Sequence, residues 1–250
     1  MGYYINCLKL SGSLKRDIKE LVPDMNLRRR MDRVVKMSVS TAIDSLLDFE
    51  PYGNVDAIIT ATGLGCITNS EKFLDNIISA QEYMVNPTPF IQSTFNTVGA
   101  QIALIRSLYC YNNTFTNRYT SFESALIDAI IHLDSGKFKA VLVGVFDEST
   151  PTLETIMHRM RLLKNSKTVG DGSIFFILTK EQLSSSVAEI DAPLFKFKAG
   201  CYISTRDTNS SIWCGAVVET ISKLIAEGKS GTIINDIDNK DNSIIKLKCL

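Results

Sequence analysis

Three short segments of the chain are apolar almost without interruption. They cover residues 55–62, 139–146 and 172–179. A strand with one face in water alternates apolar and polar side chains, whereas a strand covered on both faces is continuously apolar. These segments therefore predict an α/β fold in which helices cover both faces of a sheet, and no other feature constrains the fold as strongly.

The remaining elements follow from hydrophobic period and from helix and turn signals. The segment 86–90, Asn-Pro-Thr-Pro-Phe, is expected to break the chain, and residues 184–192 are expected to be a connection. Strands and helices largely alternate as far as residue 179, which predicts a mixed, mostly parallel sheet. Helices are expected at 28–47, 97–109, 122–135 and 211–226. Two more helices are expected to begin at a capping box, Thr68–Glu71, and at Thr150-Pro151. Further strands are expected at 3–9, 114–120, 195–203, 232–237 and 243–249.

Composition excludes several classes of protein. The 27 Lys and Arg residues are balanced by 27 Asp and Glu residues, so the chain lacks the basic excess of a nucleic-acid-binding protein. No apolar stretch approaches the about 20 residues of a membrane-spanning helix, and the first residues do not resemble a secretory leader. The six cysteines are scattered singly, as in a reducing compartment. We therefore expect a cytoplasmic protein that binds no metal, cofactor, nucleic acid or membrane.

Motifs that could carry chemistry have simpler explanations. Residues 62–66, Thr-Gly-Leu-Gly-Cys, lack the third glycine of a dinucleotide-binding turn. Ser124, Asp128 and His132 are spaced along one helix face, where their side chains would not converge as a triad does. His158, the only other histidine, is expected on a helix flank. Asp147 and Glu148 end an apolar strand and could act in chemistry or cap the next helix.

Five local strings lie in order at residues 30–33, 58–65, 89–103, 144–148 and 170–173. Together they resemble strings of the N-terminal half of the β-ketoacyl synthases, the thiolase-fold condensing enzymes. The resemblance implies a thiolase-like fold. It also implies that residues 1–180 form a ketosynthase-like half and that residues 181–250 are a short remnant of the second half packed on the same domain.

The resemblance also locates the nucleophile elbow of that family. The family has Thr-Ala-Cys-Ser-Ser where this chain reads Thr-Ser-Phe-Glu-Ser at 120–124, so Phe122 stands at the position of the catalytic cysteine. The family also carries two active-site histidines in its second half, and no histidine follows His158 here. A benzyl side chain cannot form a thioester, so the resemblance implies a relative that does not catalyse condensation.

The closest functional parallel is the chain-length factor, a ketosynthase-like subunit that pairs with an active ketosynthase in type II fatty acid or polyketide synthesis. The resemblance implies a heterodimer whose interface contains the strand at 114–120, with an acyl carrier protein as a further partner. It places the loop and helix at 90–101 near the partner's acyl pocket. The candidate pocket or interface residues are Phe90, Thr94, Phe95, Asn96, Gln101, Tyr119, Thr120, Ser121, Phe122 and Glu123.

Other interpretations remain open at the sequence level. Phe122 could fill the space that a thioester no longer needs, and Phe90, Phe95 and Tyr119 could be core or interface aromatics. The chain could instead be an acyltransferase or decarboxylase that uses Ser121, Ser124 or Glu123 on acyl-carrier-protein substrates. It could also be a homodimeric scaffold that binds a carrier protein.

Overall fold

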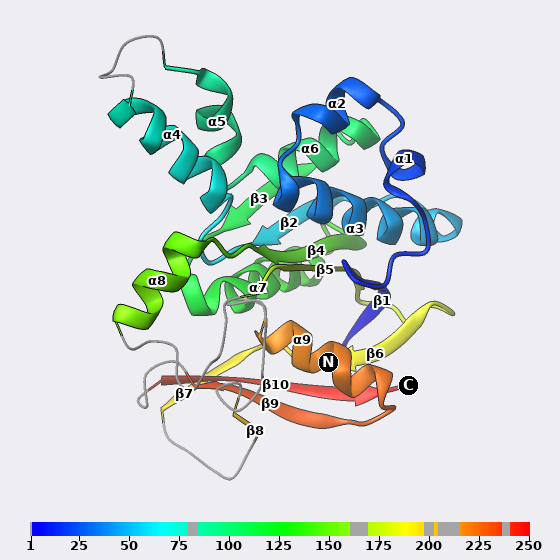
Figure 1. The fold of residues 1–250 in the computed structure, drawn as a ribbon. Helices are drawn as coiled ribbons and strands as arrows, with labels where there is room; N and C mark the ends of the chain where they lie inside the picture. The colour runs from blue at the N-terminus through cyan, green and yellow to red at the C-terminus, as the bar shows by residue number, and fades with distance from the viewer. Residues whose placement is uncertain (1, 80–84, 161–169, 198–202, 205–215, 237–240) are drawn as a thin grey trace.

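The computed structural model describes residues 2–79, 85–160, 170–197, 203–204, 216–236 and 241–250 (Figure 1). Ten strands of this part of the chain form one sheet in the order β3-β2-β4-β5-β1-β6-β10-β9-β8, with β7 also paired to β10. The strands are β1 Tyr3–Leu10, β2 Ala57–Ala61, β3 Tyr111–Phe115, β4 Ala140–Asp147, β5 Gly172–Thr179, β6 Ser186–Ile190, β7 Leu194–Phe197, β8 Ile203–Ser204, β9 Gly231–Asp236 and β10 Asp241–Cys249.

The sheet is mixed, as expected, but most of its pairs are antiparallel. β2 pairs in parallel with β3 and β4, and β8 pairs in parallel with β9. The pairs β4–β5, β5–β1, β1–β6, β6–β10, β10–β9 and β10–β7 are antiparallel. The expectation of a mostly parallel sheet is therefore corrected. An uninterrupted apolar strand reports that both faces are covered, and it does not report the direction of its neighbours.

One face of the N-terminal strands is covered by α3 (Arg33–Phe49) and α6 (Thr97–Arg106). Val39 of α3 and Ile102 of α6 are fully buried in one core cluster with Ile58 of β2. Phe175 of β5 belongs to the same cluster and occupies the space beside Gly144 of β4. This layer confirms the helix expected near 97–109, and its α3 covers most of the expected helix at 28–47.

The opposite face is covered by α7 (Ser121–Asp134) and α9 (Ala216–Ala226). Figure 1 shows these two helices between β4 and β5 on one side and β9 and β10 on the other. Phe122 and Leu126 of α7 share a core cluster with Ile221 of α9 and with Ile233 and Ile245 of the last strands. The first residues of α7 are therefore enclosed between the N-terminal strands and the C-terminal elements α9, β9 and β10.

Two helix boundaries differ from the expectation. The segment 28–47 is not one helix: α2 (Met25–Arg30) ends before Asp32, whose carboxylate accepts the Arg33 amide at 2.8 Å and begins α3. The segment 86–90 does not break the chain, because α5 (Pro87–Ser93) begins there. Asn86 caps α5 through the Thr88 amide, and proline is tolerated in a first helical turn.

Other boundaries also differ. β3 ends at Phe115, and residues 118–120 of the expected strand at 114–120 form the short 3-10 helix η2 (Arg118–Thr120). The expected connection at 184–192 contains β6, in which residues 188–190 pair with β1 on one side and with β10 on the other. Of the expected strand at 195–203, residues 198–202 lie outside the described part, as do residues 211–215 of the expected helix at 211–226.

Four further elements lie in the described part of the chain. They are α1 (Ile18–Leu21), η1 (Glu50–Tyr52), α4 (Ile67–Ser79) and α8 (Pro151–Arg159). Thr150 caps α8 by accepting the Leu153 amide, as its Thr-Pro start predicts. None of the helices in the described ranges is long and apolar enough to cross a membrane.

Candidate functional site

The elbow before α7 is fixed to the end of β2. Arg118 has a left-handed backbone with φ of 52°, an unusual conformation for a residue with a side chain. The Ser121 hydroxyl then donates to the carbonyl oxygens of Arg118 at 2.8 Å and of Thr62 at 2.9 Å. Ser121 is fully buried, so its proton is committed to backbone acceptors.

Phe122 begins the buried face of α7. Its side chain is fully buried, and its ring meets the ring of Phe176 in an edge-to-face contact with centroids 6.4 Å apart. Such a pair is a packing arrangement of the core. The position that the family resemblance assigns to the nucleophile is therefore filled by an apolar ring.

Glu123, the next residue, is a fully buried carboxyl group. Its Oε1 accepts hydrogen bonds from the Ser243 hydroxyl at 2.5 Å and from the Asn235 amide at 2.7 Å. Its Oε2 has no hydrogen-bond partner within the described structure. Burial raises the pKa of Glu123 even though both hydrogen bonds act in the opposite direction.

Asn235 and Ser243 are site residues that the sequence reasoning missed. Asn235 also donates to the Tyr119 carbonyl at 3.0 Å, so β9 holds both η2 and the first turn of α7. The only sequence signal was their position next to the isoleucine pairs of β9 and β10, in strands that also contain other polar residues. That signal gives no partner, because the contacts to Glu123 join residues separated by 112 and 120 positions.

Asp147 organises the turn that follows β2. Its Oδ1 accepts from the Thr62 hydroxyl at 2.7 Å and from the amides of Gly63 at 2.9 Å and Leu64 at 3.1 Å. The Thr62 hydroxyl in turn accepts the Gly65 amide at 2.8 Å. A carboxylate of the chain itself thus occupies the amide groups that a phosphate would need, which agrees with rejecting a dinucleotide site here.

Glu148 caps α4 from a distant part of the chain. Its Oε1 accepts the Thr68 amide at 3.0 Å, while Glu71 accepts a hydrogen bond from Thr150 at 2.6 Å. The expected capping box between Thr68 and Glu71 is therefore wrong, because each residue bonds to the segment after β4 instead. Burial raises the pKa of Glu148, whose Oε2 has no hydrogen-bond partner among the described residues.

The predicted residues between 90 and 101 separate into two groups. The Phe95 ring lies against Gly65, where a Cβ would come within 2.5 Å of it, and so packs on the turn after β2. Phe90 instead contacts Phe73 with ring centroids 5.1 Å apart, on the α4–α5 pair that projects from the molecule in Figure 1. Within this segment, the structure therefore brings Phe95 to the turn beside the elbow and places Phe90 on the projecting pair.

The other predicted residues of this segment and of the elbow have local roles. Thr94 is hydrogen-bonded to Thr97 at 2.9 Å. Asn96 is exposed and precedes α6, and the buried Gln101 Oε1 has no hydrogen-bond partner in the described structure. The half-buried Thr120 bonds the Asn117 carbonyl at 3.1 Å.

No triad forms on α7. The Ser124 hydroxyl donates to the Thr120 carbonyl at 2.9 Å, and the His132 ring stacks against Tyr111 and Phe138 with its Nε2 3.6 Å from Asp128. His158 is exposed on α8. Within the described ranges, no three His, Cys, Asp or Glu side chains are arranged to hold a metal ion.

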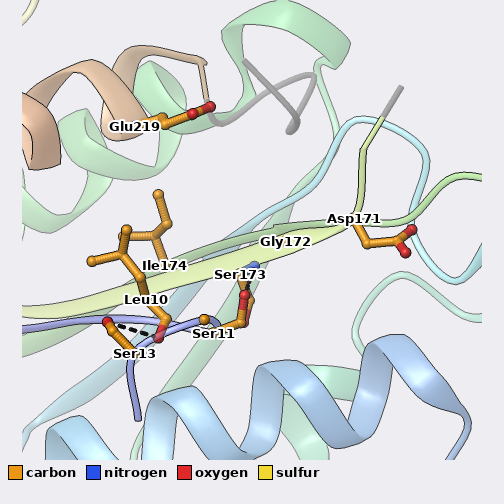
Figure 2. Close-up of a pocket in the computed structure, with 9 residues that line it drawn as sticks. Leu10, Ser11, Ser13, Asp171, Gly172, Ser173, Ile174 and Glu219 are labelled. Atoms are coloured by element: carbon orange, nitrogen blue, oxygen red, sulfur yellow. Dashed lines mark hydrogen bonds between the residues drawn. The ribbon is translucent and has the colours of Figure 1, made fainter. Parts of the chain in front are cut away.

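A surface hollow of about 310 Å³ lies where β1 ends and β5 begins. Figure 2 shows Leu10 and Ile174 pointing from these strands toward α9, which carries Glu219. The residues that line the hollow are Leu10, Ser11, Gly12, Ser13, Asp171, Gly172, Ser173, Ile174 and Glu219. None of the candidate pocket or interface residues predicted from the sequence is among them.

The layers, the buried helix at the elbow and the turn after β2 define a thiolase-like fold of the condensing-enzyme class. The family model described as Beta-ketoacyl synthase, N-terminal domain, matches residues 11–165, which is more than half of the chain. The chain therefore belongs to this family. A comparison with curated protein sequences gives no significant match.

Solved structures with the same fold include ketosynthase complexes. The ketosynthase ApeO in complex with its chain length factor ApeC from Xenorhabdus doucetiae matches with a TM-score of 0.68 and 13% identity, covering 98% of this chain and 99% of that chain. The ishigamide ketosynthase/chain length factor matches with a TM-score of 0.75 and 12% identity, covering 100% of both chains. A type II polyketide acyl-carrier protein in complex with its ketosynthase bound to the hexaketide matches with a TM-score of 0.78 and 11% identity, covering 100% of this chain and 99% of that chain.

Proposed function

We propose that this protein is a non-catalytic ketosynthase-like subunit, similar to a chain-length factor, that pairs with an active β-ketoacyl-carrier-protein synthase. The observation that carries the proposal is Phe122, whose buried ring stands where the family resemblance places the nucleophile. An acyl transfer through this position would need a thiolate at the start of the helix, and Phe122 supplies none.

The neighbouring polar groups do not replace the missing thiol. Ser121 donates its proton to two carbonyl oxygens and contacts no base among the described residues. Glu123 is enclosed, and burial favours its neutral form, which is a poor nucleophile. These contacts argue against the acyltransferase and decarboxylase alternatives.

The proposed partner surface is the edge of the sheet at β3. In the described structure β3 pairs with β2 alone, which leaves one row of backbone groups available to another chain. Leu104 at 66%, Tyr109 at 102% and Phe95 at 47% relative exposure lie on α6 or in the segments that flank α6. An open strand edge next to exposed apolar side chains is what a subunit interface would cover.

The proposal also assigns a role to the segment 90–101. In a heterodimer formed through β3, Phe95 and the helices α5 and α6 would lie close to the partner and help to limit the length of its acyl pocket. An acyl carrier protein that delivers the growing chain is the second proposed partner. We place the complex in the cytoplasm because the described cysteines Cys7, Cys66, Cys110 and Cys249 are free thiols, as a reducing compartment favours.

Co-expression with the ketosynthase of the same gene cluster tests the proposal. We expect the two proteins to co-purify and Tyr109→Asp combined with Leu104→Asp to abolish the complex. Ile156→Asp, which places the same charge at an exposed apolar position of α8, is the matched control and should leave the complex intact. Failure to co-purify, together with a product length that is indifferent to this protein, would contradict the proposal.

The two alternatives have separate tests. An enzyme would acquire an acyl group from acyl-carrier-protein thioesters, seen as a mass increase that disappears on substituting Ser121, Ser124 or Glu123. A homodimeric scaffold would give a dimer by light scattering without any ketosynthase. We expect no adduct, and we expect a dimer of this chain to dissociate when the ketosynthase is added.

A further inference from the structure

The first turn of α7 is joined to the last two strands through one carboxyl group. Glu123 receives one hydrogen bond from Asn235 of β9 and one from Ser243 of β10, and Asn235 also holds the Tyr119 carbonyl of η2. A single titratable side chain therefore connects the elbow with the β9–β10 pair.

The surroundings of this carboxyl group contain no compensating charge in the described part of the chain. Both of its donors are neutral, and its second oxygen is buried without a partner. The positive end of the α7 dipole favours the ionised form, but this effect is smaller than the cost of burying an unpaired carboxylate. The closed arrangement is thus suited to the neutral carboxylic acid.

We propose that Glu123 is a pH-sensitive latch, which in its protonated form holds the start of α7 against β9 and β10 and on ionisation releases them. The ionised carboxylate would regain its stabilisation only by reaching water, and water can reach it only if the β9–β10 pair moves away from the elbow. The proton passes to solvent, and no other reactant is required. The inference holds whether or not the chain pairs with a ketosynthase.

The groups around the latch allow its titration to be isolated. On η2, Arg118 is exposed and Tyr119 contributes its backbone carbonyl; farther along α7, Asp128 and His132 contact Tyr111 rather than Glu123. On β9 and β10, Asp236 and Asp241 carry side chains outside the described set, so a variant of Glu123 itself is needed to separate its titration from theirs.

The direction of the pH effect follows from linkage. Burial raises the pKa of Glu123 in the folded protein, so between the ordinary and the raised value the closed state retains a proton that the open state has released. Opening then becomes easier as the pH rises, by up to about tenfold in the opening constant per pH unit within that window. Above the raised value the dependence ends.

Amide hydrogen exchange at β9 and β10, measured from pH 5 to pH 9 and corrected for the intrinsic exchange rates, tests the latch. We expect protection in the wild type to fall with pH and protection in Glu123→Gln to stay constant, since the neutral amide keeps an acceptor for both donors. Glu20→Gln, at an exposed position of α1, should behave as the wild type does. Equal pH dependence in Glu123→Gln and the wild type would overturn the proposal.

A second measurement does not depend on the variant folding. Infrared difference spectra of the wild type should contain the carbonyl stretch of a protonated, buried carboxylic acid at the acid end of this pH range, and this band should disappear as protection at β9 and β10 is lost. A carboxyl group that ionises while both strands keep their full protection would also overturn the proposal.

Discussion

Around the elbow, each buried residue is committed to holding the fold. Phe122 fills the core beneath the elbow, Ser121 ties the helix start to β2, and Glu123 ties it to β9 and β10. Asp147 does the same for the turn beside them. Because these side chains are buried and bonded or packed within the fold, substitutions at the elbow should act on stability and assembly rather than on turnover.

The first consequence concerns Phe122. Removing its ring leaves a cavity between α7 and Phe176, and we expect Phe122→Ala to lower the free energy of unfolding by about 3–5 kcal/mol. Urea denaturation monitored by circular dichroism measures this loss. Phe90→Ala, at a ring that is 54% exposed, should cost clearly less. A loss below about 1 kcal/mol for Phe122→Ala would mean that the core closes over the missing ring.

Asp147 gives a second test at this scale. In Asp147→Asn the amide oxygen can accept the Thr62 hydroxyl, but the amide nitrogen then faces the Gly63 amide, which lies 3.2 Å from Oδ2 in the wild type. We expect the free energy of unfolding to fall by about 1.5–3 kcal/mol, the value of a hydrogen bond to a charged group. Denaturation by urea at constant pH measures it, and unchanged stability would show that the turn does not depend on the carboxylate.

At the level of elements, a helix or strand boundary could be predicted from the sequence where the residues that set it lie close together in the chain. The start of α8 at Thr150-Pro151 and the limits of β5 could be predicted because their signals are contained within a few residues. The break between α2 and α3 was missed since Asp32 lies within an otherwise helical pattern and acts as a cap. The expected strand at 114–120 differs from β3 because residues 118–120 form η2, whose Arg118 carbonyl shares the Ser121 hydroxyl with the carbonyl of the distant Thr62.

One link between elements is ionic. Lys9 of β1 lies 3.1 Å from the Asp44 carboxylate and 2.7 Å from that of Asp48, both on α3, and Arg16 binds the same two residues. Burial alone would raise the pKa of Asp48, but hydrogen bonds from Lys9, Lys15 and Arg16 outweigh it and bring the pKa from 3.8 to about 2. Lys9 and Asp44 are nearly or fully buried, so neither charge can be left alone without a large cost.

This cluster predicts an acid-sensitive attachment of β1 to α3. The folded pKa of Asp48 is lowered, so the unfolded chain takes up its proton first and stability is lost as the pH falls from 3.8 toward about 2. We expect Asp48→Asn to be less stable at neutral pH and to lose less of its urea midpoint across that window. Asp75→Asn, at an exposed position of α4, is the control and should follow the wild type. If the urea midpoint of Asp48→Asn fell with pH as steeply as that of the wild type, the assignment would be contradicted.

At the scale of the whole molecule, one core crosses the proposed division at residue 180. Phe122 and Leu126 of α7 pack in the same cluster as Val218 and Ile221 of α9 and Ile245 of β10. β1 and β6 also pair directly, so the sheet continues across the division. Sequence could locate the segments on either side but not their shared core, because a hydrophobic period shows which face is buried and not what covers it.

The continuous core predicts that the chain unfolds as one cooperative unit. We expect a single calorimetric transition, with equal calorimetric and van't Hoff enthalpies, because residues from both sides of position 180 share one core. Ile221→Asp, which buries an unpaired charge between α9 and α7, should lower the free energy of unfolding by more than about 3 kcal/mol and remove amide protection from α7 as well as from α9. Ala226→Asp, exposed at the end of the same helix, should do neither. If Ile221→Asp instead melted α9, β9 and β10 while α7 and β2 kept their protection, residues 1–180 would be an independent domain. The latch at Glu123 would then join two separately stable parts.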